Sequence, residues 1–105
     1  MVKKIYTLVF TDKAIASLQS IYDYIKKDSP QNANMVIETI MNTSETLITH
    51  PRIYRTDEYY HPNSKDIRRF IQWSYRIVYE VVEKDNTVVI LNIFHTSIAP
   101  KKIKG

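Results

Sequence analysis

The stretch from Asp66 to His95, DIRRFIQWSYRIVYEVVEKDNTVVILNIFH, constrains the fold of this chain more than any other part, because it is dense in β-branched and aromatic residues. Such residues favour strands. We therefore predict three consecutive antiparallel strands at Ile67–Trp73, Tyr75–Glu83 and Thr87–His95. The polar break at Lys84–Asp85–Asn86 is typical of a tight hairpin, whereas the junction between the first two strands carries a weaker turn signal.

The turn positions predict a register for these strands. A first turn at Trp73–Ser74 places Ile71 opposite Arg76, and a second turn at Asp85–Asn86 places Arg76 opposite His95. A change of one residue in either turn would move every later side chain to the other face of the sheet. The predicted pairing therefore depends on both turns.

In this register, side chains that carry chemistry gather on one face, because side chains alternate along each strand. Arg69, Arg76 and His95 are predicted to share that face near one end of the sheet. The other face is predicted to hold one arginine together with aromatic and aliphatic residues, namely Arg68, Phe70, Tyr75, Ile77 and Tyr79.

The rest of the chain predicts one strand and two helices before this sheet. Lys4–Phe10 alternates as a strand does, and Thr11 is a good N-cap for a helix that ends near Lys26–Lys27. Ser29–Pro30 opens a second helix, since proline is well suited to the first helical position. That helix ends at His50–Pro51. The order strand–helix–helix–strand–strand–strand predicts an α+β domain in which an antiparallel helical hairpin covers one face of the sheet.

The loop Pro51–Ser64 mixes charged residues with aromatic rings. Tyr59 and Tyr60 beside charges indicate a contact surface, although the rings could instead pack back over the sheet edge. Three potential metal ligands of the loop lack any recognised spacing, and no metal site is predicted from them: Asp57, Glu58 and His61.

Length and composition narrow the function classes. The 105 residues suit a single domain over positions 1–105. There is no cysteine, which excludes disulfides and thiol catalysis, and the only glycine is Gly105, so no glycine-rich phosphate loop exists. No cofactor is predicted. No stretch is apolar for long enough to span a membrane, and the start at Met1 does not read as a signal peptide, which predicts a cytoplasmic protein.

The net charge of +4 lies entirely in the second half of the chain. Residues 1–60 carry seven basic and seven acidic residues, whereas residues 61–105 carry eight basic and four acidic ones. A basic surface favours an anionic partner, either nucleic acid or an acidic protein segment. The alternative is an ordinary solvated surface.

Three functions fit the residues. In a metal-independent endoribonuclease, His95 would move the proton while Arg69 and Arg76 hold the phosphate. The structural alternative pairs both arginines with Glu80 or with backbone carbonyls, and lets the histidine merely end the sheet. The second function is a module that binds an acidic protein segment. The third is a small dimer that pairs through its open sheet face.

The ordered set of segments YTLVFTDKAIASL, IYDYIKKDSPQNA, HPRIY, EYYHPNS, IRRF, SYRIVYEVVE and VVILNIFHTS resembles the RelE/ParE superfamily of toxins from type II toxin–antitoxin (plasmid stabilisation) systems. The resemblance covers nearly the whole chain. It implies an antiparallel sheet packed by an N-terminal helical hairpin. It also implies a cognate antitoxin that wraps the toxin and blocks it. The expected assembly is a toxin–antitoxin hetero-oligomer or a homodimer.

The superfamily has two activities, and different residues of this sequence resemble members with each of them. RelE-like members cut mRNA on the ribosome, and Arg69, Arg76 and His95 match their functional residues in type and place. ParE-like members poison DNA gyrase. Ile67 stands where those nucleases often carry a second basic residue, and Thr96 stands where some carry tyrosine. The resemblance therefore favours the ParE-like side. Residues expected to contact partners are basic or aromatic: Arg68, Tyr59, Tyr60, Lys101 and Lys102.

Overall fold

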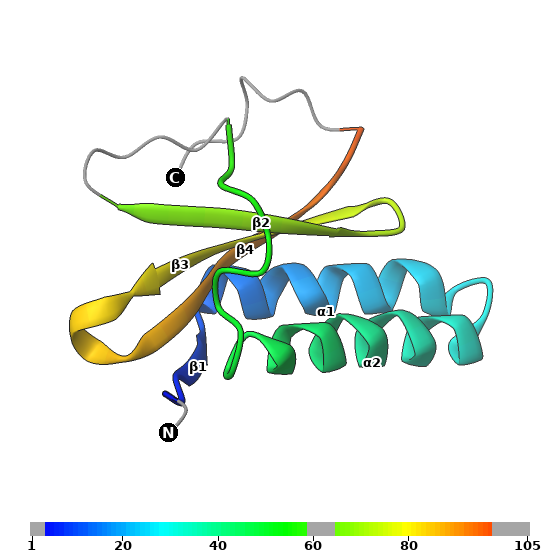
Figure 1. Cartoon of the computed structure of the whole chain (residues 1–105). Coiled ribbons are helices and arrows are strands. Elements are labelled where there is room, and N and C mark those ends of the chain that lie inside the picture. The colour runs from blue at the N-terminus through cyan, green and yellow to red at the C-terminus, as the bar shows by residue number, and fades with distance from the viewer. Residues whose placement is uncertain (1–3, 59–64, 98–105) are drawn as a thin grey trace.

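The computed structural model describes residues 4–58 and 65–97, and in these residues the chain forms one sheet and one helical hairpin (Figure 1). The sheet order is β1-β4-β3-β2. The predicted α+β fold class and element order are confirmed. In chain order the elements are β1 (Thr7–Phe10), α1 (Asp12–Lys26), α2 (Pro30–Thr46), β2 (Asp66–Gln72), β3 (Tyr75–Val82), a short 3-10 turn (Glu83–Asp85) and β4 (Thr87–His95).

Both helices begin where the sequence predicts. The Thr11 side chain accepts a hydrogen bond from the amide of Ala14, and the Ser29 side chain accepts one from the amide of Asn32. Each hydroxyl thus satisfies one of the orphan donors of a first helical turn. Pro30 occupies the first turn of α2, where its missing N–H removes no hydrogen bond.

The core lies between the helical hairpin and one face of the sheet, which Figure 1 shows above the two helices. Helix α2 buries Ala33, Val36 and Ile40 at helical spacing. The strands contribute alternate residues to the same core. Those from the two central strands are Ile77, Tyr79, Val81, Val88, Ile90 and Ile93.

One strand differs in direction from what the resemblance implies. β1 pairs with β4 in parallel, so the sheet is mixed. A parallel neighbour requires a long connection between the two strands, and the helical hairpin together with β2 and β3 provides it. β1 is also shorter than the predicted Lys4–Phe10, because Lys4, Ile5 and Tyr6 precede the first paired residue.

The first hairpin has the predicted register. Gln72 pairs with Tyr75 across the two-residue turn, and Ile71 pairs with Arg76. Trp73 takes up a left-handed conformation in this turn, with φ of 52°, which suits the strand twist of a tight hairpin but is unusual for a bulky residue. Arg69 and Arg76 therefore share a face, as predicted.

The predicted pairing of Arg76 with His95 is wrong. The second turn occupies four residues, 83–86, and the register shifts again at Val78/Tyr79. Arg76 consequently pairs with Phe94, and His95 pairs with Tyr75. The net slip of one residue moves the histidine to the face that carries the helices.

Neither helix in the described part of the chain is long and apolar enough to cross a membrane.

Candidate functional site

Two arginines converge on the sheet face opposite the helices, and two carboxylates meet them there. Arg76 Nε donates to Asp57 Oδ2 over 3.0 Å, and another nitrogen of the same guanidinium donates to Glu58 Oε1 over 2.8 Å. Arg69 contacts both oxygens of Glu58 at 3.4 Å. We call Asp57, Glu58, Arg69 and Arg76 the open-face arginine cluster.

The loop before β2 places the two carboxylates. The amide of Asp57 donates to the carbonyl of Ile67, and the amide of Arg69 donates to the carbonyl of Arg55. Thr56 forms an isolated antiparallel bridge with Arg68. The loop thus extends the edge of the sheet by a few residues, and this pairing brings its acidic end over the arginines.

Burial differs between the two carboxylates. The Asp57 side chain is 1% exposed and that of its partner Arg76 is 11% exposed, whereas the Glu58 side chain is 42% exposed. The hydrogen bond from Arg76 lowers the pKa of Glu58. Burial of Arg76 opposes its charge, but the hydrogen bonds to Asp57 and Glu58 outweigh that effect and raise its pKa. Each of these two shifts favours the charged form, so Glu58 and Arg76 hold their charges at neutral pH.

Arg69 has donor capacity that the cluster does not use. Its two contacts to Glu58 lie at the outer limit for a hydrogen bond. Its Nε is buried and has no hydrogen-bond partner among the residues that the structure describes. A guanidinium offers five N–H donors in a fixed fork, so the terminal nitrogens of this arginine can donate to a further oxygen ligand without losing a strong contact.

His95 lies apart from this cluster. Its ring meets the Tyr75 ring edge-on, with 5.6 Å between centroids, and Nδ1 accepts the amide N–H of Ser97 at 3.1 Å. The Ser97 hydroxyl lies 2.7 Å from the same nitrogen. The predicted trio of Arg69, Arg76 and His95 is therefore not one site: the structure brings the arginines together and leaves the histidine on the helix side.

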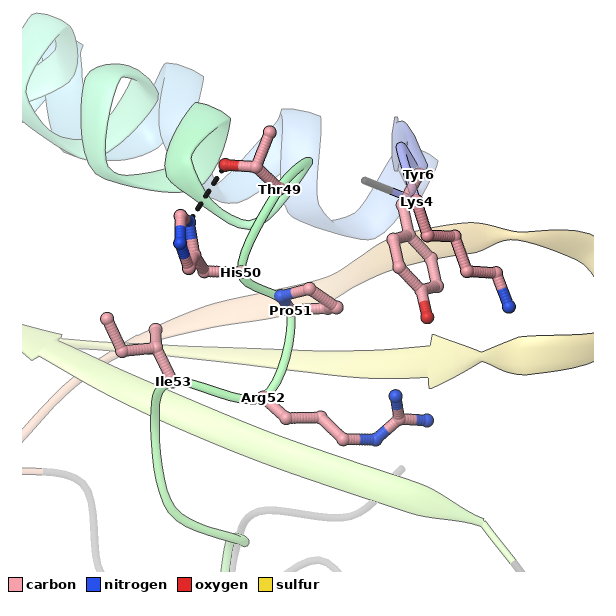
Figure 2. A pocket seen from close by; sticks show the side chains of 7 residues that line it. All are labelled: Lys4, Tyr6, Thr49, His50, Pro51, Arg52 and Ile53. Carbon is pink, nitrogen blue, oxygen red and sulfur yellow. Dashed lines mark hydrogen bonds between the residues drawn. The ribbon is translucent and has the colours of Figure 1, made fainter. Parts of the chain in front are cut away.

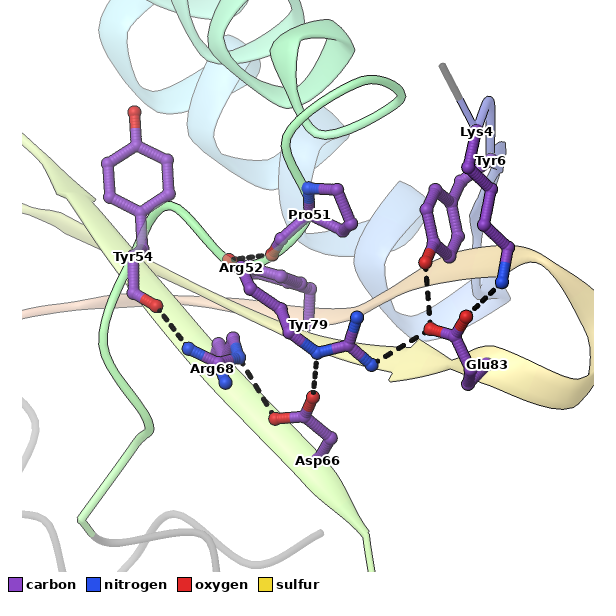
Figure 3. Close-up of polar contacts among 9 residues, drawn as sticks. All are labelled: Lys4, Tyr6, Pro51, Arg52, Tyr54, Asp66, Arg68, Tyr79 and Glu83. Atoms are coloured by element: carbon purple, nitrogen blue, oxygen red, sulfur yellow. Dashed lines mark hydrogen bonds and ion pairs between the residues drawn. The ribbon is translucent and has the colours of Figure 1, made fainter. Parts of the chain in front are cut away.

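A second polar network lies at the edge of the sheet where α2 connects to β2. Figure 3 shows its side chains converging from the segment before β1, the loop after α2, strand β2 and the 3-10 turn that follows β3. Glu83 accepts from Tyr6 over 2.7 Å and also pairs with Lys4 and Arg52. Asp66 is shared by two guanidinium groups, with Arg52 Nε and Arg68 Nε each at 2.9 Å.

We call these six residues, Lys4, Tyr6, Arg52, Asp66, Arg68 and Glu83, the Glu83 network. Hydrogen bonds from Lys4, Tyr6 and Arg52 lower the pKa of Glu83 to about 2. Arg68 also donates to the carbonyl of Tyr54 over 2.7 Å. Both carboxylates receive at least one donor on each oxygen. Arg68, predicted as a binding residue, lies on the helix side and is held within it.

A cavity of about 430 Å³ adjoins the Glu83 network. Figure 2 shows His50 and Ile53 on one side of the hollow and Arg52, Lys4 and Tyr6 on the other. Thr49 Oγ1 lies 2.9 Å from His50 Nδ1. Because Lys4, Tyr6 and Arg52 all bind Glu83, as Figure 3 shows, the cations that border the cavity already have a counter-ion.

The other predicted contact residues, Tyr59, Tyr60, Lys101 and Lys102, lie outside the described residues, as does His61. Sequence reasoning considered Asp57 and Glu58 only as metal ligands and missed their pairing with the arginines. It also expected Glu80 as an arginine partner. The position of Asp57 and Glu58 in the sequence could have indicated this pairing. They lie in the loop that leads into an edge strand, and such a loop is well placed to pair along that strand.

Solved structures with the same fold are toxins of two kinds. A chain of the chromosomal ParDE toxin–antitoxin system from P. aeruginosa is 20% identical, with 88% of this chain and 97% of that chain covered and a TM-score of 0.67. The archaeal RelE–RelB complex from Pyrococcus horikoshii is 17% identical over 90% and 99%, with a TM-score of 0.64. The isolated E. coli RelE toxin is 18% identical over 90% and 87%, with a TM-score of 0.61. At these identities the likeness defines the fold alone.

The fold and the sequence therefore define a small toxin of the RelE/ParE superfamily. Residues 8–100 match the family described as the ParE toxin of the type II toxin–antitoxin system, parDE. The chain belongs to this family. No curated protein matches its sequence.

Proposed function

We propose that this ParE-family toxin arrests growth by inhibiting DNA gyrase and that it does not cut RNA. Gyrase as the target is what the resemblance to ParE-like toxins implies. One observation supports the choice against a nuclease: the residues that would form the nuclease site are divided between two faces. Arg69 and Arg76 are engaged by carboxylates, and His95 stands beside Tyr75 on the helix side.

The chemistry of RNA cleavage explains why this division matters. Attack by a 2′-hydroxyl needs a proton-transfer group and a cation at the same phosphate. Loss of the proton-transfer group alone costs ~10²–10⁴-fold in rate. A histidine on the opposite side of the sheet from the arginines cannot serve their phosphate.

The test compares the two targets directly. Purified toxin is incubated with DNA gyrase and supercoiled plasmid, and in parallel with ribosomes programmed with mRNA. Our proposal expects trapped DNA breaks in the first assay and intact mRNA in the second. Cleaved mRNA together with normal gyrase turnover would establish the RelE-like alternative. In cells, DNA synthesis should fall before protein synthesis, and a gyrase-resistant host should be spared.

One observation keeps the ribonuclease as the second candidate, namely that Arg69 and Arg76 do converge on one face. Substitution of His95 separates the two readings. The residue is exposed at the end of β4, so His95→Ala should keep the fold. A ribosome-dependent nuclease that uses this histidine would lose its growth arrest with the variant, whereas we expect the arrest to persist.

We further propose that a cognate antitoxin neutralises this toxin in the cytoplasm, as part of a system that stabilises a plasmid or a chromosomal locus. Both the ParDE and the RelE–RelB structures that share its fold come from toxin–antitoxin systems. A small acidic reading frame beside the gene should encode the antitoxin. Co-expression of that frame should restore growth and yield a hetero-oligomer on size-exclusion chromatography.

A further inference from the structure

The open-face arginine cluster contains one contact that can be exchanged and one that cannot. Asp57 is buried against Arg76 and is held by its backbone hydrogen bond to Ile67. Glu58 is the next residue, but its side chain is 42% exposed and it bridges Arg76 and Arg69 from the solvent side. A partly exposed ion pair of this kind contributes little to stability. An incoming anion could displace it.

We propose that Glu58 is a specificity-determining residue: its carboxylate occupies an oxyanion site formed by Arg69 and Arg76 and so excludes nucleic-acid phosphate from the open face of the sheet. This goes beyond the proposed function, because it concerns a latent binding capacity of this chain whatever its cellular target is.

Charge supports the inference. The cluster holds two guanidinium groups and two carboxylates and is neutral as it stands. Without the Glu58 carboxylate it would carry one net positive charge on two convergent guanidinium forks. This is the charge and donor arrangement that binds a phosphodiester, which has one negative charge and two unbridged oxygens.

The unfilled donors of Arg69 favour phosphate over another carboxylate. Glu58 already offers this arginine two carboxylate oxygens, yet the terminal nitrogen of Arg69 reaches both only at 3.4 Å. A flat carboxylate therefore does not satisfy both forks at once. A tetrahedral phosphate presents oxygens in more directions, so that one can approach Arg76 while another approaches Arg69.

The experiment measures binding of an unstructured single-stranded RNA oligonucleotide to the purified full chain by fluorescence anisotropy. Four proteins are compared: wild type, Glu58→Gln, Glu38→Gln and the double variant Glu58→Gln/Arg69→Ala. Glu38 is exposed on α2, which packs on the other face of the sheet. Its replacement removes the same charge without touching the arginines.

We expect Glu58→Gln to bind the RNA about tenfold more tightly than wild type, equivalent to ~1.4 kcal/mol. Glu38→Gln should change the affinity by less than about twofold. One additional phosphate contact should also steepen the dependence of log K on log salt by about 0.7 for single strands. The double variant should return to the wild-type affinity and salt slope.

Equal affinities for Glu58→Gln and Glu38→Gln would overturn the proposal, since net charge alone would then account for any gain. A gain that survives in the double variant would also overturn it, because Arg69 would not be the ligand. The same anisotropy measurement is made with a labelled poly-glutamate peptide. If Glu58→Gln increases the affinity for this peptide as much as the affinity for the RNA, the assignment to phosphate is refuted. Glu58→Ala should show the same increase in RNA affinity. This second variant tests the proposal even if Glu58→Gln does not fold.

Discussion

The two polar clusters of this toxin contain the same kinds of groups and differ in how completely they are satisfied. In the Glu83 network both carboxylates receive donors on each oxygen. The contacts of Glu83 with Tyr6 and Arg52, and those of Asp66 with Arg52 and Arg68, are between 2.7 and 3.0 Å long. In the open-face arginine cluster, Arg69 makes two contacts of 3.4 Å and leaves a buried donor unused. Buried donors without partners are rare in native proteins and often mark a function.

The difference between the clusters indicates that they have different roles, one structural and one in binding. The Glu83 network joins the segment before β1, the loop after α2, strand β2 and the 3-10 turn after β3 (Figure 3), so it connects parts of the chain that are distant in sequence. Within residues 4–58 and 65–97, the arginine cluster joins the loop before β2 to the face of the strands beside it. We therefore regard the first as structural and the second as a site whose ligand can change.

The largest expected effect comes from removing the buried cation of the arginine cluster. Arg76→Ala takes the guanidinium away from Asp57, whose side chain is only 1% exposed. Breaking a buried ion pair on one side costs ~3 kcal/mol. Urea denaturation at pH 7 should report that loss in the free energy of unfolding.

The double variant Arg76→Ala/Asp57→Ala is the control for this prediction. It removes both charges, so it should recover part of the lost stability relative to Arg76→Ala. A single variant as stable as the wild type would mean that the Arg76–Asp57 pair is not the anchor of the loop.

A smaller effect is expected beside the Glu83 network. The Tyr79 hydroxyl is buried and donates to the carbonyl of Pro51 over 2.8 Å, which fixes the start of the loop that carries Arg52. Tyr79→Phe leaves that carbonyl without its donor and should cost ~1–1.5 kcal/mol. Tyr24→Phe is the matched control, since Tyr24 is 71% exposed, and thermal or urea unfolding should separate the two variants.

The two clusters also differ in how far the sequence could predict them. The fold was predictable, because Thr11 and Ser29–Pro30 are strong helix starts and residues 66–95 are strongly strand-forming. The convergence of Arg69 and Arg76 was predictable because it depends only on the short first hairpin. The place of His95 was not, because a four-residue turn and a register shift lie between it and Arg76.

The carboxylate partners were beyond sequence reasoning for a related reason. Asp57 and Glu58 reach the arginines through irregular loop pairing with β2, and no periodic pattern reports such pairing. The Glu83 network likewise joins Lys4, Arg52 and Glu83, which are far apart in the chain. Contacts of this kind follow from the tertiary fold and not from local spacing.

The dependence of stability on acidic pH should test the contribution of the Glu83 carboxylate to the Glu83 network. The pKa of Glu83 is lowered to about 2 in the folded state, below the ~4.3 of an unfolded glutamate. A group with a depressed folded pKa stabilises the fold above its unfolded pKa, and that contribution is lost as the pH falls toward the folded value. Stability should therefore decline between about pH 4.5 and pH 2. Glu83→Gln should show a shallower decline when urea midpoints are compared across that range.

The smallest expected effect on stability distinguishes the exchangeable carboxylate of the open-face arginine cluster, Glu58, from the buried one, Asp57. Glu58→Gln removes an ion pair whose carboxylate is 42% exposed, and such solvent-screened pairs contribute at most ~1 kcal/mol. Urea unfolding at pH 7 should therefore place the variant close to wild type, with Arg76→Ala far below both. A large loss in Glu58→Gln would mean that this carboxylate is as structural as Asp57. A small loss would leave Glu58 free to act as an exchangeable ligand of Arg69 and Arg76, since a contact that costs little to break can yield to a competing anion.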